Sequence, residues 1–279
     1  MGAALSVRAP LLAAFRQPMV ADTKVDFHDI VTIHDRQTEE MLKSYIGERV
    51  GGSRFIGEEG GASGDGPIHW YIDPIDGTAN FAAGLAFWCV SIGAVVNGEI
   101  LAGVVLDPVT GNVFTADISG AWLNGERLRS RARPGESDAM VVTSYPVARD
   151  FRLDGRTHAL DNFATLAERF CTVRRTGSAA LSLCHVAAGW CDAAIGFGVN
   201  AWDVAAAILI LRQAGGRYDA YGLGKVEPNA AEFSCPGYVA VGANGNYPTL
   251  GTIAERVSAH RIERRVYQIG SPTAFNAES

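Results

Sequence analysis

The sequence predicts a mixed α/β fold, with a helical start and antiparallel strands in the first half and alternating strands and helices in the second. Hairpin signals indicate the antiparallel part, because apolar stretches in residues 87–117 are joined at Asn97-Gly98 and at Thr110-Gly111-Asn112. Strand-like and helix-like segments alternate in residues 139–244, which is typical of an α/β architecture. The 279 residues are 48% hydrophobic and 19% charged, as in a globular protein with an ample core.

The N-terminal half is expected to form a helix and then a sheet. Residues 36–49 have the apolar spacing of an amphipathic helix, and a glycine-rich turn with the short segment 53–61 follows. Residues 68–75 are mostly apolar, as in a buried strand, and this strand ends at a pair of aspartates. Beyond the hairpins, Asn124-Gly125 predicts one more tight turn.

The C-terminal half is expected to begin near residues 130–138, a polar segment that contains a proline. Its predicted strands are 139–146, 191–196 and 238–244, and its predicted helices are 157–170, 179–189 and 202–216. We therefore expect one compact unit made of an N-terminal half (1–135), a C-terminal α/β half (136–265) and a flexible tail (266–279).

Charge and cysteine content limit the class of protein. The net charge of −6 argues against a nucleic-acid partner, because phosphate backbones select basic surfaces. The five cysteines are an odd number and no Cys-x-x-Cys occurs, which fits buried thiols in a reducing cytoplasm better than disulfides or a zinc site. No apolar run reaches the roughly 18 residues that a membrane span needs, so no membrane partner is expected.

Several carboxylates stand where a predicted strand or helix ends beside glycine or an aromatic residue. These residues are Asp35, Glu58, Asp73, Asp76 and Asp203. Carboxylates that converge in a partly desolvated cleft repel one another unless cations join them. Since the set contains oxygen ligands and neither His nor Cys, it suits a hard cation, Mg²⁺ before Zn²⁺.

The hexapeptide Asp73–Thr78, DPIDGT, concentrates this chemistry. Its proline fixes the backbone between the two carboxylates, and the Ile75 carbonyl offers a further oxygen ligand. Gly77 lets the chain turn, and Thr78 opens a short helix whose free N–H groups suit a phosphate. The pattern predicts that the aspartates are metal ligands at a phosphate site.

The chain resembles the inositol monophosphatase family of Mg²⁺-dependent, Li⁺-sensitive phosphatases. The resemblance runs from Lys24 to about Gly245 and is carried by ordered motifs: DIVTIHD, FIGEEGG, WYIDPIDGTANF, GAWLNGERL, RRTGSAALSLCHVAAG and WDVAAAILILRQAGG. It implies a layered αβαβα sugar-phosphatase fold, assembled as a homodimer, with two or three Mg²⁺ ions in each active site.

The resemblance also implies a role for each matching residue. The implied first metal site consists of Glu58, Asp73, the Ile75 carbonyl and Thr78, and the second of Asp73, Asp76 and Asp203. Glu58 would orient and deprotonate the attacking water, with Thr78 and Asp35 as partners. The substrate-binding residues would be Asp76, Gly77, Thr78, Gly177, Ser178, Ala179 and Asp203, of which 177–179 border the alcohol.

One position departs from the family pattern. Inositol-specific members carry a glutamate seven residues before the Trp-Asp aspartate, and this chain has Gly196 there. The expected substrate is a small polyol or sugar monophosphate, with myo-inositol monophosphate as the default. Histidinol phosphate, fructose 1,6-bisphosphate and 3′-phosphoadenosine 5′-phosphate remain alternatives, as does a regulatory binding protein that keeps the fold.

Some single residues allow two interpretations. Glu59 is equally a supporting residue of the site or a surface carboxylate, and Asp203 is also a good helix cap. The histidines lack metal-ligand spacing, so structural roles are expected for them, and Cys89 and Cys184 are expected to be core thiols.

Overall fold

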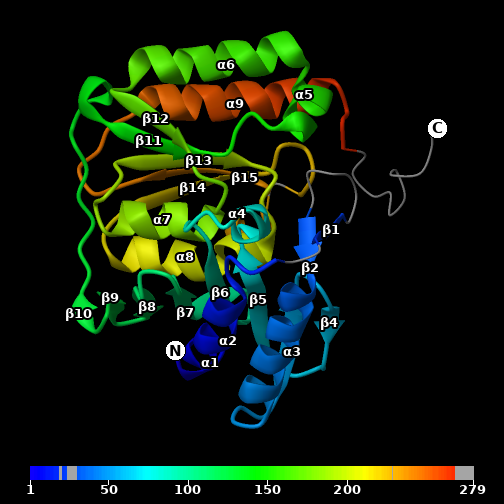
Figure 1. The fold of residues 1–279 in the computed structure, drawn as a ribbon. Helices are drawn as coiled ribbons and strands as arrows, with labels where there is room; N and C mark the ends of the chain where they lie inside the picture. The colour runs from blue at the N-terminus through cyan, green and yellow to red at the C-terminus, as the bar shows by residue number, and fades with distance from the viewer. Residues whose placement is uncertain (19–20, 24–29, 228, 268–279) are drawn as a thin grey trace, which may run out of the picture.

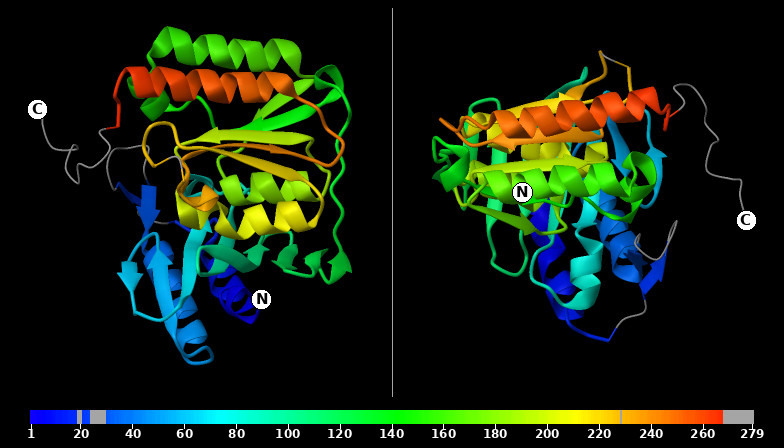
Figure 2. Two further views of the ribbon diagram at one scale, coloured as in Figure 1. Left: turned by 180° about the vertical axis from the view of Figure 1, so that it is seen from behind. Right: turned by 90° about the horizontal axis from the view of Figure 1, so that it is seen from above.

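The computed structural model describes residues 1–18, 21–23, 30–227 and 229–267, and it has five layers in the order αβαβα (Figure 1). Helices α5, α6 and α9 cover one face of a five-stranded sheet, and α7 and α8 lie between this sheet and an eight-stranded sheet. Helices α1, α2 and α3 lie on the far side of the larger sheet (Figure 2). The layered sugar-phosphatase fold is therefore confirmed.

The larger sheet has the strand order β10-β9-β8-β7-β6-β5-β3-β4, and all its neighbours are antiparallel except the parallel pair β3–β5. Both Asn-Gly turns adopt the left-handed backbone that tight hairpins need, with φ of 52° at Asn97 and 53° at Asn124. Its strands are β3 (Ser53–Gly57), β4 (Gly61–Ser63), β5 (Ile68–Asp76), β6 (Cys89–Val96), β7 (Glu99–Leu106), β8 (Val113–Asp117), β9 (Gly120–Leu123) and β10 (Glu126–Arg127).

The smaller sheet has the order β12-β11-β13-β15-β14 and mixes parallel and antiparallel pairs. Its edge strands β12 and β14 were not predicted, because the sequences TVRR and RYDAY carry the polar residues that suit an exposed edge. The strands are β11 (Met140–Thr143), β12 (Thr172–Arg175), β13 (Ala193–Phe197), β14 (Arg217–Tyr221) and β15 (Gly237–Val241). A separate small pair joins β1 (Ala21–Thr23) to β2 (Ile30–Thr32).

The helices include four that the sequence pattern did not single out, α1, α2, α5 and α9. Helices α1 and α2 are too short to show a clear period, and their few buried residues pack beside α3. In chain order the helices are α1 (Gly2–Ser6), α2 (Arg8–Ala14), α3 (Ile33–Gly47), α4 (Thr78–Ala83), α5 (Ala148–Asp154), α6 (Arg156–Arg169), α7 (Ala179–Ala187), α8 (Ala201–Gln213) and α9 (Pro248–Glu263). Most of the expected tail, residues 268–279, lies outside the described residues.

The middle helical layer joins the two sheets. Helix α8 is buried on all sides from Val204 to Leu211, because it contacts β6, β7 and β8 on one side and β14 on the other. In the described parts of the chain, no helix is long and apolar enough to cross a membrane.

Candidate active site

The Asp73–Asp76 segment lies at the end of the central strand β5. This strand is buried from Ile72 onward, and its pairing with β6 shifts register between the two aspartates, where Pro74 offers no N–H. Gly77 then turns the chain with φ of 97°, and a β-carbon there would lie 3.1 Å from the Phe87 carbonyl oxygen. The turn therefore needs glycine, and α4 begins directly after it at Thr78.

Asp73 stands among other negative charges. It is 2% exposed, and burial raises its pKa well above the usual range. The carboxylates of Glu58, Asp76 and Asp203 raise the pKa of Asp73 further. Carboxylates from three separate segments, Glu58, Asp73 with Asp76, and Asp203, thus lie near enough for their charges to act on Asp73.

Asp76 is held rigidly by the segment that leads into α7. Its Oδ2 accepts hydrogen bonds from Ser178 Oγ at 2.6 Å and from the Ala180 amide at 2.7 Å, and its Oδ1 accepts one from the Ala179 amide at 3.3 Å. These donors oppose the rise in the pKa of Asp76 that burial causes. Ser178 and Ala179 of the predicted loop 177–179 therefore contact this carboxylate.

Asp203 lies in the first turn of α8. Its Oδ2 accepts a hydrogen bond from the Asn200 amide at 2.7 Å, so it closes a capping box at the start of the helix. Burial and the charges of Asp76 and Glu58 raise the pKa of Asp203. Capping and a place in the carboxylate cluster are therefore compatible, since the capping bond uses one oxygen.

The buried Asp35 and the half-buried Thr78 form a hydrogen-bonded pair. The Thr78 hydroxyl lies 2.9 Å from Asp35 Oδ1 and 3.0 Å from the Ile75 carbonyl oxygen. Asp35 is held in place because its Oδ2 accepts hydrogen bonds from the amide and hydroxyl of Thr32 at 2.8 and 2.7 Å. One hydroxyl proton cannot serve two acceptors, and the charged Asp35 is the stronger of the two.

Glu58 belongs to a loop that a buried glutamate of α3 supports. Glu39 is 1% exposed, and its two oxygens accept hydrogen bonds from the Glu59 and Gly60 amides, each at 2.8 Å. Lys43 lies 2.6 Å from the same carboxylate. The sequence analysis missed Glu39, although its place four residues after Asp35 puts both side chains on one helix face. Glu59 is half-buried, and its amide carries this support.

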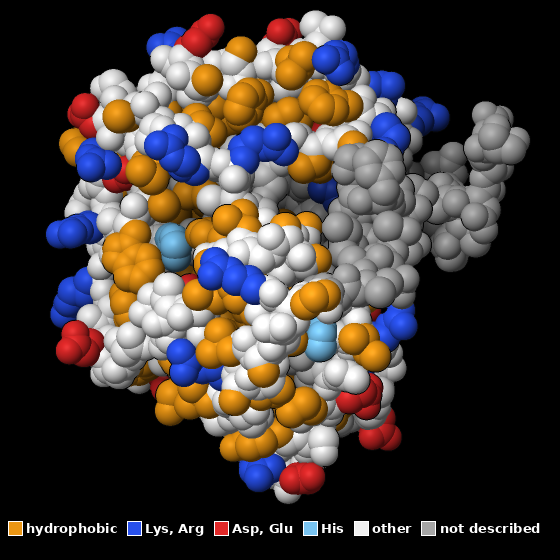
Figure 3. Space-filling view, viewed as in Figure 1, with side chains coloured by type: hydrophobic (Ala, Val, Ile, Leu, Met, Phe, Trp, Pro, Cys, Tyr) orange, Lys and Arg blue, Asp and Glu red, His pale blue; other side chains and the backbone are white. Residues whose placement is uncertain are grey.

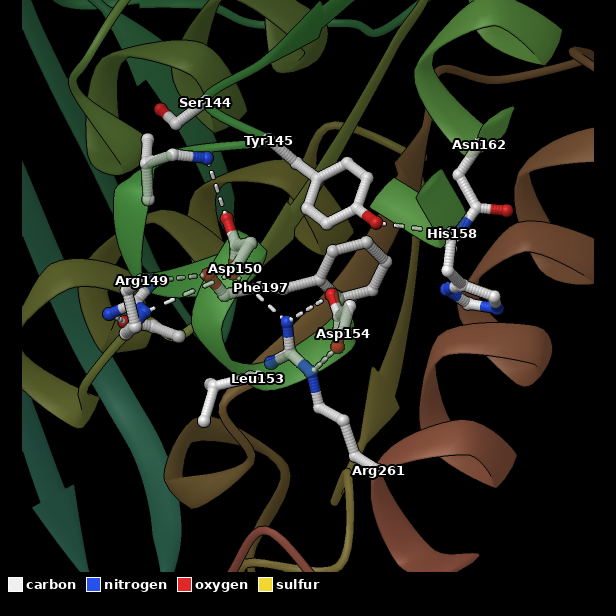
Figure 4. A network of polar contacts seen from close by, with 12 residues as sticks. Ser144, Tyr145, Arg149, Asp150, Leu153, Asp154, His158, Asn162, Phe197 and Arg261 are labelled. Carbon is white, nitrogen blue, oxygen red and sulfur yellow. Dashed lines mark hydrogen bonds and ion pairs between the residues drawn. The ribbon is translucent and has the colours of Figure 1, made fainter. Parts of the chain in front are cut away.

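Arg149 holds the segment between β13 and α8. Its guanidinium donates to the Phe197 carbonyl at 2.6 Å and to the Gly198 carbonyl at 3.0 Å, and its charge favours the ionised form of Asp203. Next to it, the fully buried Arg261 of α9 bonds to Asp150 and Asp154 of α5 (Figure 4). The sequence analysis missed Arg149, since a lone arginine far from every motif gives no signal.

The histidines and cysteines fit structural roles. His185 packs edge-on against the rings of Phe87 and Trp190, at 5.3 and 4.9 Å between centroids. All five cysteines are described and form no disulfide, and Cys89 and Cys184 are fully buried, as expected.

The donor set fits a hard cation by its chemistry. Among the described residues, no three His, Cys, Asp or Glu side chains already stand in an arrangement that could hold a metal ion. The carboxylates nevertheless lie close enough for their charges to raise the pKa of Asp73 and of Asp203, while the positive charge of Arg149 partly offsets the rise at Asp203. A bound cation would remove the repulsion that keeps such carboxylates apart and would let them approach one another.

Comparisons with known proteins agree with this geometry. The family model described as the inositol monophosphatase family matches residues 1–258. A Nus factor SuhB from Pseudomonas aeruginosa is 38% identical over 206 residues, covering 72% of this chain and 76% of that protein. Inositol monophosphatase 1 from Rattus norvegicus is 37% identical over 199 residues, covering 67% and 70% of the two chains.

Solved structures give the same picture. An extragenic suppressor protein SuhB from Bartonella henselae matches with a TM-score of 0.78 and 28% identity, covering 93% of this chain and 95% of that one. An IMPase from Thermotoga maritima matches with a TM-score of 0.77 and 29% identity, covering 94% and 96%. The chain therefore belongs to the inositol monophosphatase family of enzymes that hydrolyse phosphomonoesters.

Proposed function

We propose that this protein is a Mg²⁺-dependent phosphatase of small phosphorylated polyols or sugars, with myo-inositol monophosphate as the default substrate. The observation that carries the proposal is the convergence of Glu58, Asp76 and Asp203 on the buried Asp73. Members of the family generally depend on Mg²⁺. The residues that would hold the ions are Glu58, Asp73, Asp76, Asp203 and the Ile75 carbonyl, for two or three ions per site.

Bound Mg²⁺ would supply the positive charge that neutralises the carboxylates and the phosphoryl group. The protein's own groups would position and deprotonate the attacking water. Thr78 donates to Asp35, so its lone pairs are turned to accept a proton from water, and Glu58 stands beside Asp73 as the base. The start of α4 leaves the Gly77 and Thr78 amides without intrahelical acceptors, which suits phosphate oxygens.

Phosphate release from a panel of phosphorylated polyols, sugars and nucleotides tests the proposal, measured with Mg²⁺ and again with excess EDTA. We expect release that requires Mg²⁺, falls at high Ca²⁺ and is inhibited by Li⁺. Asp76→Asn is the matched control, because it is nearly isosteric and removes one expected ligand charge. Full activity in EDTA, or more than about a tenth of wild-type rate in Asp76→Asn, would overturn the metal assignment.

A regulatory role is a second candidate, because several similar proteins are named Nus factor SuhB. The face drawn in Figure 3 carries Lys and Arg side chains at separate places rather than as one basic block. Release of phosphate from no member of the panel, in a folded and Mg²⁺-loaded protein, would favour the regulatory role. We further propose that the protein is a cytoplasmic homodimer. Light scattering of the purified protein tests its oligomeric state.

A further inference from the structure

Ser178 lies where the loop before α7 meets the end of β5. It is the N-cap residue of α7, and its Oγ accepts a hydrogen bond from the Leu181 amide at 3.2 Å. The same Oγ donates to Oδ2 of Asp76 at 2.6 Å, across 102 positions of the chain. One hydroxyl thus starts a helix and holds a carboxylate of the site.

The Ser178 hydroxyl is already committed within the chain. Its single proton goes to Asp76, because an ionised carboxylate can only accept, and one of its lone pairs accepts from the Leu181 amide. Cys89 Sγ is a third neighbour of this hydroxyl, at 3.8 Å. Since Ser178 is 1% exposed, its hydroxyl is closed to a molecule that arrives from solvent.

The loop before Ser178 is fixed by α4. The side-chain amide of Asn80 donates to the Thr176 carbonyl and to the Phe87 carbonyl, each at 2.7 Å. Gly177 adopts φ of 80°, and a β-carbon there would lie 3.2 Å from Asn80 Nδ2. Because α4 holds the loop on one side of Ser178 and α7 begins on the other, the hydroxyl has a fixed position.

The two oxygens of Asp76 differ in their hydrogen bonds. Oδ2 accepts from Ser178 Oγ at 2.6 Å and from the Ala180 amide at 2.7 Å, and Cys89 Sγ lies 3.8 Å from it. In the described part of the chain, Oδ1 accepts only from the Ala179 amide, at the longer distance of 3.3 Å. The protein therefore uses Oδ2 to fix the carboxylate and leaves a lone pair of Oδ1 for a cation.

We propose that Ser178 is a positioning residue whose hydroxyl fixes Asp76 for a metal ion and does not bind the substrate. This inference rests on the proposed function, in which Asp76 is a ligand of Mg²⁺. A ligand that is already held in one orientation loses less conformational freedom when the ion binds, so the affinity for the ion is higher. The alcohol part of the substrate is then left to groups other than this hydroxyl.

Isothermal titration calorimetry of the metal-free protein with Mg²⁺, in the absence of substrate, tests the proposal. We expect Ser178→Ala to raise the Kd for Mg²⁺ about tenfold, and Ser178→Thr, which keeps the hydroxyl, to stay within about twofold of wild type. An unchanged Kd in Ser178→Ala would overturn the inference. So would a Ser178→Thr variant that keeps the wild-type Tm but binds Mg²⁺ as weakly as Ser178→Ala.

Thr249→Ala is the matched control. Thr249 also lies at the start of a helix, α9, and its hydroxyl donates to a carboxylate, Glu136 Oε2 at 2.7 Å. The variant should lower Tm about as Ser178→Ala does and leave the Kd for Mg²⁺ unchanged. If both variants raise the Kd alike, the effect comes from a general loss of stability and the inference is overturned.

Phosphate release separates positioning from substrate contact. At saturating Mg²⁺, Ser178→Ala should change the ratio of kcat/KM for myo-inositol 1-phosphate to that for p-nitrophenyl phosphate, which has no alcohol hydroxyls, less than about threefold. A larger fall in this ratio would show that the hydroxyl binds the alcohol part of the substrate and would overturn the inference. Absence of Mg²⁺ binding in the wild type would instead overturn the proposed function, and this inference with it.

Discussion

At the residue scale, the site is built from pairs in which one residue fixes another. Thr32 holds Asp35, Asp35 faces Thr78, and Thr78 also contacts the Ile75 carbonyl. Asp73 accepts the Ile75 amide at 3.0 Å through Oδ1, and Asp203 accepts the Asn200 amide at 2.7 Å through Oδ2, so each is fixed by a bond to one of its oxygens. A rigid acidic cluster results, and this rigidity limits reorganisation during the reaction.

The Thr78–Asp35 pair gives the first prediction. Thr78→Ala removes the hydroxyl that Asp35 orients, and we expect kcat to fall roughly 10²–10³-fold. Asp35→Ala should cost a similar factor, and the double variant little more than either one, because the residues act as a unit. Steady-state kinetics at saturating Mg²⁺ measures this. Losses that multiply in the double variant would show that the two groups act independently.

Removing a repulsive charge gives the second prediction. The pKa of Asp73 is higher in the folded protein than in the unfolded chain, where it is about 3.9. Asp73 therefore stabilises the fold at pH values below the unfolded-state pKa, and this stabilisation is lost as the pH rises through the folded-state pKa. In EDTA at pH 8, Asp73→Asn should therefore have a higher Tm than wild type. Each kcal/mol added to the free energy of unfolding raises Tm by about 2–4 °C, and the difference in Tm between the two proteins should become smaller toward pH 4. Activity should be lost.

Asp107→Asn is the control for this stability measurement. Asp107 is also buried, but its Oδ1 accepts hydrogen bonds from the Val109 and Thr110 amides at 2.9 and 3.1 Å. The same substitution there should not raise Tm in EDTA. If both variants raise Tm alike, the gain comes from the amide and not from relief of the carboxylate repulsion.

At the element scale, the ends of α3, α7 and α8 bring separate segments to the end of β5. Helix α7 binds Asp76 through its first turn, and α8 carries Asp203 in its first turn. The segment between β13 and α8 is clamped by Arg149, which itself lies beside the buried Arg261 network. The position of Asp203 therefore depends on contacts that reach as far as α9.

Arg149 gives the third prediction. Arg149→Met should raise the Mg²⁺ concentration for half-maximal activity about tenfold, because Asp203 loses both a fixed loop and a nearby positive charge. Arg149→Lys should recover part of this, since lysine keeps the charge but not the two-pronged hydrogen bond. The measurement is a Mg²⁺ titration of phosphate release.

Arg212→Lys serves as the matched control for Arg149. Arg212 also donates to a backbone carbonyl, that of Tyr218 at 3.2 Å, but it lies in the last turn of α8. Its replacement should leave the Mg²⁺ titration unchanged. If Arg149→Met lowers Tm but leaves the Mg²⁺ titration of phosphate release unchanged, Arg149 has only a structural role.

At the scale of the whole molecule, the two sheets share one core. Helices α7 and α8 contribute half of the buried residues in the largest hydrophobic cluster, which also contains Val105 and Phe114 of the larger sheet and Val142 and Ala240 of the smaller one. Because neither sheet can bury its inner face without these helices, we expect the two halves to depend on each other for stability.

The shared core gives the fourth prediction. Residues 1–135 alone should not form the native sheet, because α7 and α8 begin after residue 178 and cover one face of that sheet. The full chain should unfold in a single calorimetric transition whose calorimetric and van't Hoff enthalpies agree. A folded 1–135 fragment with dispersed amide signals, or two separate transitions, would contradict this expectation.

The sequence by itself determined the strands and turns whose signals are local. The Asn-Gly hairpins, the buried strand that ends in DPIDGT and the helix of residues 201–213 lie where periodicity and turn chemistry predicted them. The motif residues also identified the family, because residues that bind an ion or fix a turn leave a short and specific pattern.

Only the tertiary structure decided which residues support the site from a distance. Glu39 and Arg149 each act through a partner at least 20 positions away in the chain. Glu39 and Arg149 bind backbone groups, which every residue has, so their partners cannot be read from residue types. Gly196 shows the same limit, because the sequence showed only that a glutamate is absent there, whereas the fold places the ring of Tyr238 beside the glycine.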